Sequence, residues 1–470
     1  MKVDSNNFIS LAEIAIDNPN LQEAITKGTN NAFDKRQLAM FADGRAHGEA
    51  MRQQAAEAKR RALRQLPELL EKAENMMTEN GFIVKWAVDG NEANQMVLDI
   101  IREHGVQTVT KSKSMLTEEI GLNPVLEASD VRVVETDLGE YIIQLNNEPP
   151  SHIIAPVLHR TKAEIRDIFV RELNMTPTDD AGEMVAFARD KLRSDFVNSD
   201  MGISGGNFII AETGSLALVM NEGNGRMCMS LPKVHVALVG IEKVIESLDD
   251  YATLTQVLPR SGTGQNMTVY TNIINGPSRP DEDGGPEIVY IILVDNGRSD
   301  IYATDYAEAL ACIRCGACQN ACPVYRSTGG HAYGWVYGGP IGAVITPLLV
   351  GLDEASPLPY ASSLCGSCKQ VCPVDIDLPR MLLDLRHDLV EKGNGGRVWQ
   401  LGMNAWAFGN VSPMRFELGG RVARLGQKVV GNNLPGVLGK WTKYRDFPDF
   451  APKSFRQMWR EREKGSDHNG

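Results

Sequence analysis

The chain has 470 residues, of which 43% are hydrophobic and 23% are charged, a globular composition with enough apolar material for several hydrophobic cores. Its net charge of -12 argues against nucleic-acid binding, which depends on neutralising phosphates. The N-terminal residues show no basic start followed by an apolar stretch, and no run approaches the roughly 20 apolar residues that a membrane span needs. We therefore expect a cytoplasmic protein with no transmembrane segment and no nucleic-acid partner.

Residues 1–80 are predicted to form a helical N-terminal arm, because from residue 31 onward they are rich in Ala, Leu, Glu, Lys and Arg with apolar residues at helical spacing. In residues 81–300 the pattern changes to short β-branched runs that alternate with amphipathic stretches. Candidate helices are 92–104, 162–171 and 181–194, and candidate strands are 82–88, 106–110, 131–136, 152–155, 208–211, 216–219, 234–239, 267–272 and 288–294. This alternation predicts an α/β domain with a largely parallel sheet, whose ligands would lie at the carboxyl ends of the strands.

Residues 301–390 hold most of the cysteines: seven of the eight lie within 61 residues. In a chain without an export signal, clustered cysteines indicate metal ligands rather than disulfides. Cys312, Cys315, Cys318 and Cys322, followed by Pro323, have the spacing C-x2-C-x2-C-x3-C-P, which is typical of ferredoxin-like iron–sulfur proteins. A zinc site, the alternative, usually uses two separated pairs of ligands.

The second group, Cys365, Cys368 and Cys372 with Pro373, matches the last three positions of this motif, and Ser362 stands at the first position. In two-cluster ferredoxins the fourth cysteine of a motif ligates the other cluster. The spacing thus predicts a [4Fe-4S] cluster one, held by Cys312, Cys315, Cys318 and Cys372, and a cluster two held by Cys322, Cys365 and Cys368. Cluster two is either [4Fe-4S], completed by Ser362, solvent or a partner, or [3Fe-4S]. The isolated Cys228 is expected to be an ordinary packed cysteine.

Residues 391–470 form a basic, Trp-rich C-terminal region. From residue 380 onward the chain has 16 Lys and Arg against 9 Asp and Glu, and it holds four of the six tryptophans. Such a region suits docking to an acidic partner or peripheral contact with membrane headgroups, although a solvated helical tail would have the same charge.

Several segments before the cysteines are distinctive, namely residues 111–120, 135–144, 149–153, 211–215, 221–226 and 258–265. Together with the cysteine region they resemble the LutB-type lactate utilisation iron–sulfur family, from about residue 30 to residue 450. The resemblance implies a LUD domain, an open sheet similar to that of the sugar-phosphate isomerase and CoA-transferase superfamily, followed by an α-helical two-cluster ferredoxin-like domain. It also implies that the protein works with other lactate utilisation subunits in oxidising L-lactate to pyruvate, so that cells can grow on lactate. Three cysteines in the second motif are what this family shows.

Two adjacent clusters are typical of electron transfer, and no G-x-G-x-x-G motif in a strand–turn–helix context indicates a dinucleotide or flavin. We therefore expect an electron-transfer subunit with no catalytic residue of its own, although the sequence does not identify the electron acceptor. The alternative is a stand-alone redox or metabolite sensor with a small-anion pocket in the LUD domain. Candidate pocket residues are Glu212, Thr213, Lys111, Lys113, Arg226 and Arg260, which would otherwise be a turn and surface ion pairs, whereas His152 and His159 are expected to have packing roles.

Overall fold

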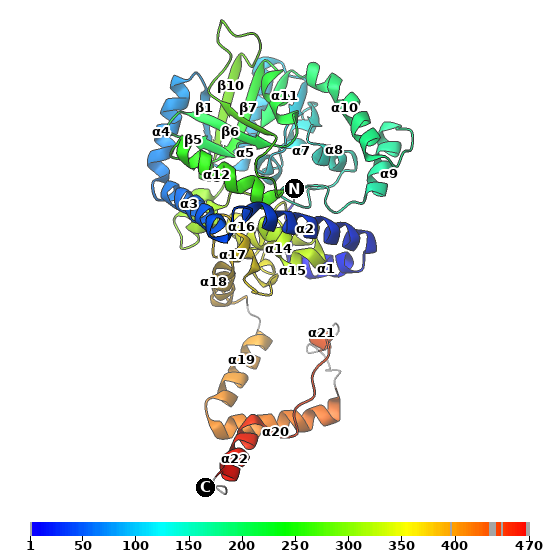
Figure 1. Ribbon diagram of the computed structural model, residues 1–470, viewed down its shortest axis with the longest axis vertical. Helices are drawn as coiled ribbons and strands as arrows, with labels where there is room; N and C mark the ends of the chain where they lie inside the picture. Colours follow the sequence, from blue (N-terminus) through cyan, green and yellow to red (C-terminus); the bar gives the residue numbers. More distant parts are fainter. Residues whose placement is uncertain (1, 395–396, 432–438, 443–444, 467–470) are drawn as a thin grey trace. The chain divides into compact units, whose positions relative to one another are not determined.

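The computed structural model describes residues 2–394, 397–431, 439–442 and 445–466 (Figure 1). The chain divides into two compact units, one ending at Leu389 and one beginning at Val390. The boundaries predicted near residues 80 and 300 lie inside the first unit and stay predictions.

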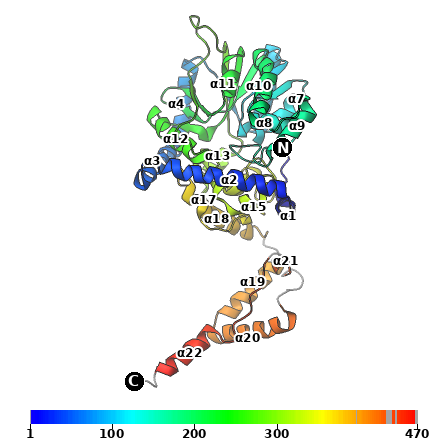
Figure 2. The same ribbon diagram turned by 45° about the vertical axis from the view of Figure 1, so that its right-hand side comes forward.

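The first unit begins with helices that contact both the sheet and the cysteine segment. They are the short 3-10 helix Ser5–Asn7 and then α1 (Phe8–Ile16), α2 (Pro19–Met40), α3 (Arg45–Arg64) and α4 (Leu66–Glu79). Helix α2 starts where the Asn18 side chain accepts the N–H of Leu21 and Pro19 occupies the first turn, which caps the helix. Helix α4 packs on the sheet at β1, whereas α2 contacts the cysteine-bearing α14 (Figures 1 and 2).

The central sheet has six strands, all parallel, in the order β1-β10-β7-β4-β2-β3. The strands are β1 (Ile83–Ala87), β2 (Thr108–Lys111), β3 (Arg132–Glu135), β4 (Met201–Ser204), β7 (Val234–Gly240) and β10 (Ile288–Val294). Strands β7 and β10 are nearly continuous Val, Ile and Leu runs because both faces of a parallel sheet are buried by helices. The predicted helix-flanked parallel sheet is therefore confirmed.

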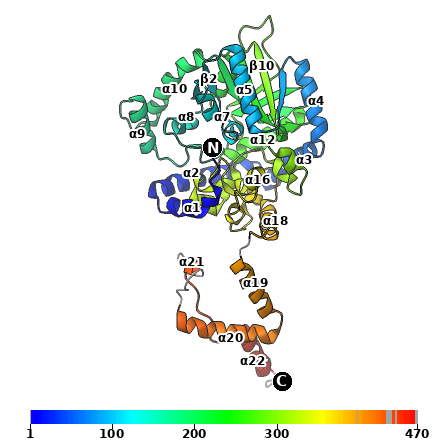
Figure 3. The ribbon, with the colours of Figure 1, turned by 180° about the vertical axis from the view of Figure 1, so that it is seen from behind.

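Two apolar cores lie on the two faces of this sheet. On one face, seen from behind in Figure 3, α5 (Gly90–His104) contributes Val97 and Ile101 to a core with Ile292 of β10. On the other face, Leu69 and Leu70 of α4 belong to a core that includes Ile291 of β10, the residue before Ile292. This is expected because side chains alternate between the two faces along a strand. The remaining helices are α6 (Met115–Glu119), α7 (Leu122–Glu127), α8 (Leu138–Leu145), α9 (Lys162–Leu173), α10 (Ala181–Val197), α11 (Asn224–Ser230) and α12 (Leu248–Gly262).

The structure differs from the sequence-based strand assignment in three places. Four strands, β5 (Phe208–Ile210), β6 (Ser215–Met220), β8 (Val244–Ile245) and β9 (Tyr270–Ile274), form a separate sheet with two antiparallel pairings and one parallel pairing. The strand predicted at residues 152–155 does not form, because Nδ1 of His152 accepts the N–H groups of Ile154 and Ala155, which a strand would need for its ladder. The buried strands β4 and β8 were not predicted.

The cysteine segment is helical, as expected. It comprises α13 (Arg298–Tyr302), the 3-10 helix Ala307–Ala311, α14 (Ala317–Ala321), α15 (Pro323–Thr328), the 3-10 helix His331–Tyr333, α16 (Gly339–Val350), the 3-10 helix Leu358–Tyr360, α17 (Ser367–Val371) and α18 (Leu378–Glu391).

The second unit is also helical, with α19 (Arg397–Asn410), α20 (Pro413–Val430), α21 (Gly439–Thr442) and α22 (Phe455–Ser466). Several of its large apolar side chains are exposed, among them Trp406, Phe416 and Trp459. Among the described residues, no helix combines the length and apolar character required to cross a membrane.

Candidate metal centre

The first cysteine motif forms a tight loop. Arg314 and Gly316, on either side of Cys315, have φ angles of 59° and 71°, in the left-handed region that a non-glycine residue seldom adopts. Cys318 lies on α14, and Cys322 immediately precedes α15, whose first turn holds Pro323.

The second motif repeats this local structure. Leu364 and Gly366 have φ angles of 54° and 83°, at the positions that correspond to Arg314 and Gly316. In the first motif the N–H of Arg314 donates to Sγ of Cys312 at 3.4 Å, and in the second the N–H of Leu364 donates to Oγ of Ser362 at 3.1 Å. The Ser362 hydroxyl therefore has the same local role as the Cys312 sulfur.

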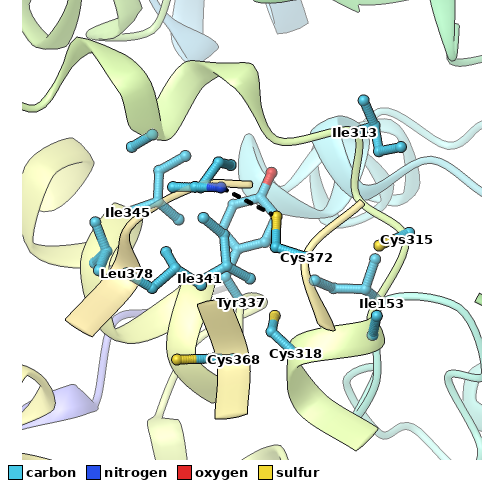
Figure 4. Packing of buried hydrophobic residues seen from close by; sticks show 14 of the residues in the cluster. Ile153, Ile313, Cys315, Cys318, Tyr337, Ile341, Ile345, Cys368, Cys372 and Leu378 are labelled. Atoms are coloured by element: carbon cyan, nitrogen blue, oxygen red, sulfur yellow. Dashed lines mark hydrogen bonds between the residues drawn. The ribbon is translucent and has the colours of Figure 1, made fainter. Parts of the chain in front are cut away.

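Four cysteines from both motifs line one small cavity. Cys312, Cys315, Cys318 and Cys372 surround it, together with apolar residues that include Ile153, Ile313, Ile341 and Leu378. Figure 4 shows the sulfur atoms of Cys315, Cys318 and Cys372 around a common space, whereas Cys368 points away from it. The second motif thus contributes its last cysteine to the cavity of the first motif.

Burial and mutual repulsion set the pKa of these thiols. Burial, and then the charge of Cys372, raises the pKa of Cys315 to about 12. Burial likewise raises the pKa of Cys368 to about 12, but here the next cause is Cys322, and Cys365 adds to it. Cys315 thus interacts with Cys372, and Cys368 with Cys322 and Cys365, while Cys318 interacts with Cys312 and Cys315 and also with Cys368.

Cations compensate for negative charge near the cysteines of the cavity. Arg36 of α2, whose exposed fraction is 2%, donates to the carbonyl of Val371 at 2.8 Å. Arg52 of α3 donates to the carbonyl of Cys372 at 2.8 Å. Soft thiolate donors converging in an apolar cavity, with guanidinium groups behind them, fit an iron–sulfur cluster, whose thiolate ligands bring negative charge.

The second predicted set of ligand cysteines reaches the surface, since Cys365 is exposed while Cys315, Cys318 and Cys372 are buried. Cys228 lies apart from both sets: it is buried, its Sγ is 3.3 Å from Oγ1 of Thr136, and burial raises its pKa to about 11. As predicted, Cys228 is a packed cysteine.

A pocket of about 430 Å³ lies at the carboxyl ends of β2, β4 and β7. This is where open α/β sheets bind ligands. Its walls include residues that follow these strands, such as Lys113, Gly205 and Lys243. Arg314 and Tyr337 of the cysteine segment complete the lining, so the pocket adjoins the first cysteine motif.

Of the basic residues singled out in the sequence, only Lys113 lines this pocket. Lys111 is fully buried and bonded to Glu135 at 2.7 Å and Glu118 at 3.1 Å, so it holds a structural ion pair inside the domain. Arg226 is exposed, and Arg260 donates to the carbonyl of Ala39. The expectation of surface ion pairs is therefore wrong for Lys111, whose charge is neutralised in the interior.

The other candidates have structural roles. Glu212 accepts the N–H of Leu248 at 2.9 Å in the turn after β5, and the Thr213 hydroxyl pairs with that of Ser215 at 2.6 Å. Burial lowers the pKa of His152 to about 3, so its imidazole is neutral. His159 bridges Ser151 and Glu148, each at 2.8 Å. Both histidines therefore have packing roles, as expected.

Sequence reasoning missed a buried ionic network between the sheet and the cysteine segment. Arg298 binds Glu119 through two bonds of 2.9 Å and Glu242 through one of 2.7 Å. Tyr337 donates to Glu119 at 2.6 Å, and its ring lies under the guanidinium of Arg314 at 4.4 Å. No local pattern could have indicated these contacts, because they join residues far apart in the sequence.

Comparisons with known proteins agree with this architecture. Residues 70–294 match a LUD domain model, residues 308–376 a 4Fe-4S dicluster domain model, and residues 385–464 a model described as lactate utilisation protein B, C-terminal. A "Lactate utilization protein B" of Bacillus velezensis is 41% identical, covering 99% of this chain and 98% of that protein. Proteins of the same name from Oceanobacillus iheyensis and Bacillus subtilis are 41% and 40% identical, covering 96% and 98% of this chain and 98% of each relative. A crystal structure of a DUF162 family protein from Deinococcus radiodurans is 11% identical and overlays with a TM-score of 0.27, covering 49% of this chain and 98% of that one.

The chain is 41% identical to a relative over nearly its whole length, and three domain models match successive segments of it. These two findings assign its family. This chain belongs to the lactate utilization protein B family, as an iron–sulfur protein with a LUD domain and a 4Fe-4S dicluster domain.

Proposed function

We propose that the chain is the iron–sulfur electron-transfer subunit of a complex that oxidises L-lactate to pyruvate and supports growth on lactate. The observation that carries this proposal is the convergence of cysteines from both motifs on one cavity, next to a second set that reaches the surface. Two clusters placed in this way form a path from the interior to the surface. We take L-lactate as the substrate because the relatives are named lactate utilization proteins.

The proposed ligand assignment follows the spacing of the two motifs and the lining of the cavity. Cluster one is [4Fe-4S], with Cys312, Cys315, Cys318 and Cys372 as ligands. Cluster two has Cys322, Cys365 and Cys368, and a [4Fe-4S] cluster there takes Ser362, solvent or a partner group as its fourth ligand. Ser362 is supported by its hydroxyl, which accepts the N–H of Leu364 as the Cys312 sulfur accepts that of Arg314. A [3Fe-4S] cluster, which needs only the three thiolates, is the competing form.

The chemistry is divided between this chain and other lactate utilisation subunits. Oxidation of L-lactate to pyruvate releases two electrons and two protons, and each cluster carries one electron at a time. A partner subunit would remove the electron pair from lactate, and the clusters that these cysteines would hold would supply one-electron carriers between that subunit and an acceptor. The exposed Cys365 makes cluster two the exchange point with a partner.

The test is lactate-dependent reduction of the clusters, followed by their visible absorption under anaerobic conditions. The isolated chain should contain 7 to 8 irons, an approximate figure for one cubane plus a three- or four-iron cluster. It should not be reduced by L-lactate alone and should be reduced once the partner subunits are added. Cys312→Ser should damage cluster one, Cys365→Ser should damage cluster two, and the matched control Cys228→Ser should leave both spectra unchanged.

Other outcomes would contradict the proposal. Stoichiometric zinc with little acid-labile sulfide would exclude the clusters. Robust lactate oxidation by the isolated chain would move the chemistry onto this subunit. A protein that carries clusters yet binds no other lactate utilisation subunit would be a stand-alone redox sensor.

A further inference from the structure

The pocket between the sheet and the first cysteine motif has a cationic end. Lys243, in the 3-10 turn Ile241–Lys243 after β7, and Arg314 both line it. Among the described residues, Lys243 has no ion-pair or hydrogen-bond partner for its ammonium group. Arg314 has an exposed side-chain fraction of only 10%, and its Nη1 is buried without a hydrogen-bond partner. A buried guanidinium nitrogen without a protein partner is satisfied by bound water or by a ligand.

The neighbouring carboxylates do not neutralise this end. The nearest to Arg314 is Glu242, with 3.9 Å between Nη2 and Oε1, but the other oxygen of Glu242 is taken by Arg298 at 2.7 Å. Glu119 is likewise held by Arg298. Four cations meet here, because the buried Lys59, which donates to the carbonyl of Glu242 at 2.7 Å, joins Arg298, Lys243 and Arg314. The carboxylates of Glu119 and Glu242 do not balance them, and another nearby anionic group is the Cys312 sulfur. An uncompensated buried charge costs free energy that a bound anion would recover.

The rest of the pocket limits the size and charge of the anion. Ile153, Ile154 and Leu258 give it apolar walls near the cysteine motif. Elsewhere in the lining, the single cation Lys113 lies near the carboxyl groups of Asp137 and Glu222, and burial together with Asp137 raises the pKa of Glu222 to about 7. A ligand with anionic groups at both ends would meet repulsion there, whereas one anionic head on a short neutral body would not.

We propose that this pocket binds a small monocarboxylate, with its carboxylate between Lys243 and Arg314 and its neutral body against the apolar wall. This inference rests on the proposed function, which makes L-lactate and pyruvate the carboxylates to test. The planar fork of an arginine suits a carboxylate, and stacking on Tyr337 at 4.4 Å holds that fork in place.

The site is coupled to cluster one through Arg314. This residue lies between Cys312 and Cys315, and its backbone N–H donates to the Cys312 sulfur. The wall on the other side is also close, since a Cβ added to Gly262 of α12 would lie 3.1 Å from the carbonyl oxygen of Cys315. An anion held by Arg314 and an electron added to cluster one bring negative charge to the same place. Anion binding therefore disfavours reduction of cluster one, and reduction of cluster one weakens anion binding by the same factor.

The experiment measures binding and potential on the cluster-loaded chain under anaerobic conditions. Calorimetry with L-lactate, pyruvate and inorganic phosphate gives the affinity of the oxidised protein for each anion. Redox titration of cluster one with and without pyruvate gives the coupling: a tenfold weaker affinity of the reduced protein lowers the potential by about 59 mV. The test variants are Lys243→Gln and Arg314→Gln. The matched controls are Lys233→Gln and Arg226→Gln, because both residues are exposed and neither lines the pocket. Iron content is measured for each variant.

We expect at least tenfold weaker carboxylate binding in Lys243→Gln and Arg314→Gln, unchanged binding in both controls, and loss of the pyruvate-dependent shift in potential. Lys243→Gln tests the site even if Arg314→Gln loses iron. Binding of phosphate alone would overturn the carboxylate class, and absent or variant-independent binding would overturn the site. The proposed function is judged separately by reduction of the clusters of the unmodified chain with lactate and the partner subunits, which is expected whether or not the pocket binds a carboxylate.

Discussion

Replacing Arg298 by methionine should destabilise the first unit strongly, because Arg298 is the cation of a buried network. Its exposed side-chain fraction is 2%, and those of its partners Glu119 and Glu242 are 0% and 2%. Methionine retains much of the volume but removes three bonds of 2.7 to 2.9 Å and leaves two buried carboxylates without their main cation. Removing one partner of a buried ion pair costs about 3–5 kcal/mol. We expect a loss in that range.

The assay is urea unfolding of the cluster-loaded protein, followed by far-ultraviolet circular dichroism under anaerobic conditions. The change in free energy is taken from the shift in midpoint multiplied by the slope of the transition. The matched control is Arg102→Met, whose ion pair with Asp99 at 2.8 Å is more than 60% exposed on both sides and should contribute below about 1 kcal/mol. If Arg298→Met cost no more than Arg102→Met, the network would not join the sheet to the cysteine segment.

Three further predictions concern cluster two, the second unit and pH. Ser362→Cys should give a full [4Fe-4S] cluster two, whereas Ser362→Ala should lose iron there or yield [3Fe-4S], as seen by iron analysis and electron paramagnetic resonance; identical spectra for both would exclude Ser362 as a ligand. Ending the chain at residue 394 should weaken binding to the partner subunits in a pull-down while leaving the iron content unchanged; equal binding would remove the docking role of the second unit. Burial lowers the pKa of His235 to about 4, so this fully buried histidine is neutral when folded and takes up a proton only on unfolding below its usual value of about 6.5. Stability should therefore fall by about 1 kcal/mol between pH 7 and pH 5.5, and His235→Gln should reduce this dependence in unfolding midpoints measured at both pH values.

The parallel sheet was predictable where strands are long and β-branched, as in β7 and β10. Strand β4, Met201-Gly-Ile-Ser204, was missed because glycine and serine lower strand propensity. Its glycine is nevertheless required by packing, since a Cβ on Gly202 would lie 1.7 Å from the carbonyl oxygen of Cys228. Tertiary packing, which a local pattern does not contain, determined this strand.

The candidate site shows the same division. The dicluster domain was predictable because cluster ligation imposes short, fixed cysteine spacings within one loop, and such spacing is visible in a linear sequence. Lys243 and Arg314 were not found because they meet only when the end of β7 faces the first cysteine motif. The two lysines that the sequence suggested have different environments. Lys111 forms an ion pair with Glu135 inside the domain, whereas Lys113 lines the pocket.

The position of Arg314 explains why the two parts of the first unit belong together. A cluster that only relays electrons needs no contact with a ligand pocket, yet one residue of the cluster-binding loop lines the LUD pocket, and Tyr337 holds that residue while donating to Glu119 of the sheet domain. Any anion that pulls on Arg314 therefore acts on the loop that carries Cys312 and Cys315. With the proposed carboxylate bound there, electrostatics requires the pocket and cluster one to respond to each other, so the proposed binding site and the proposed electron path are coupled through Arg314.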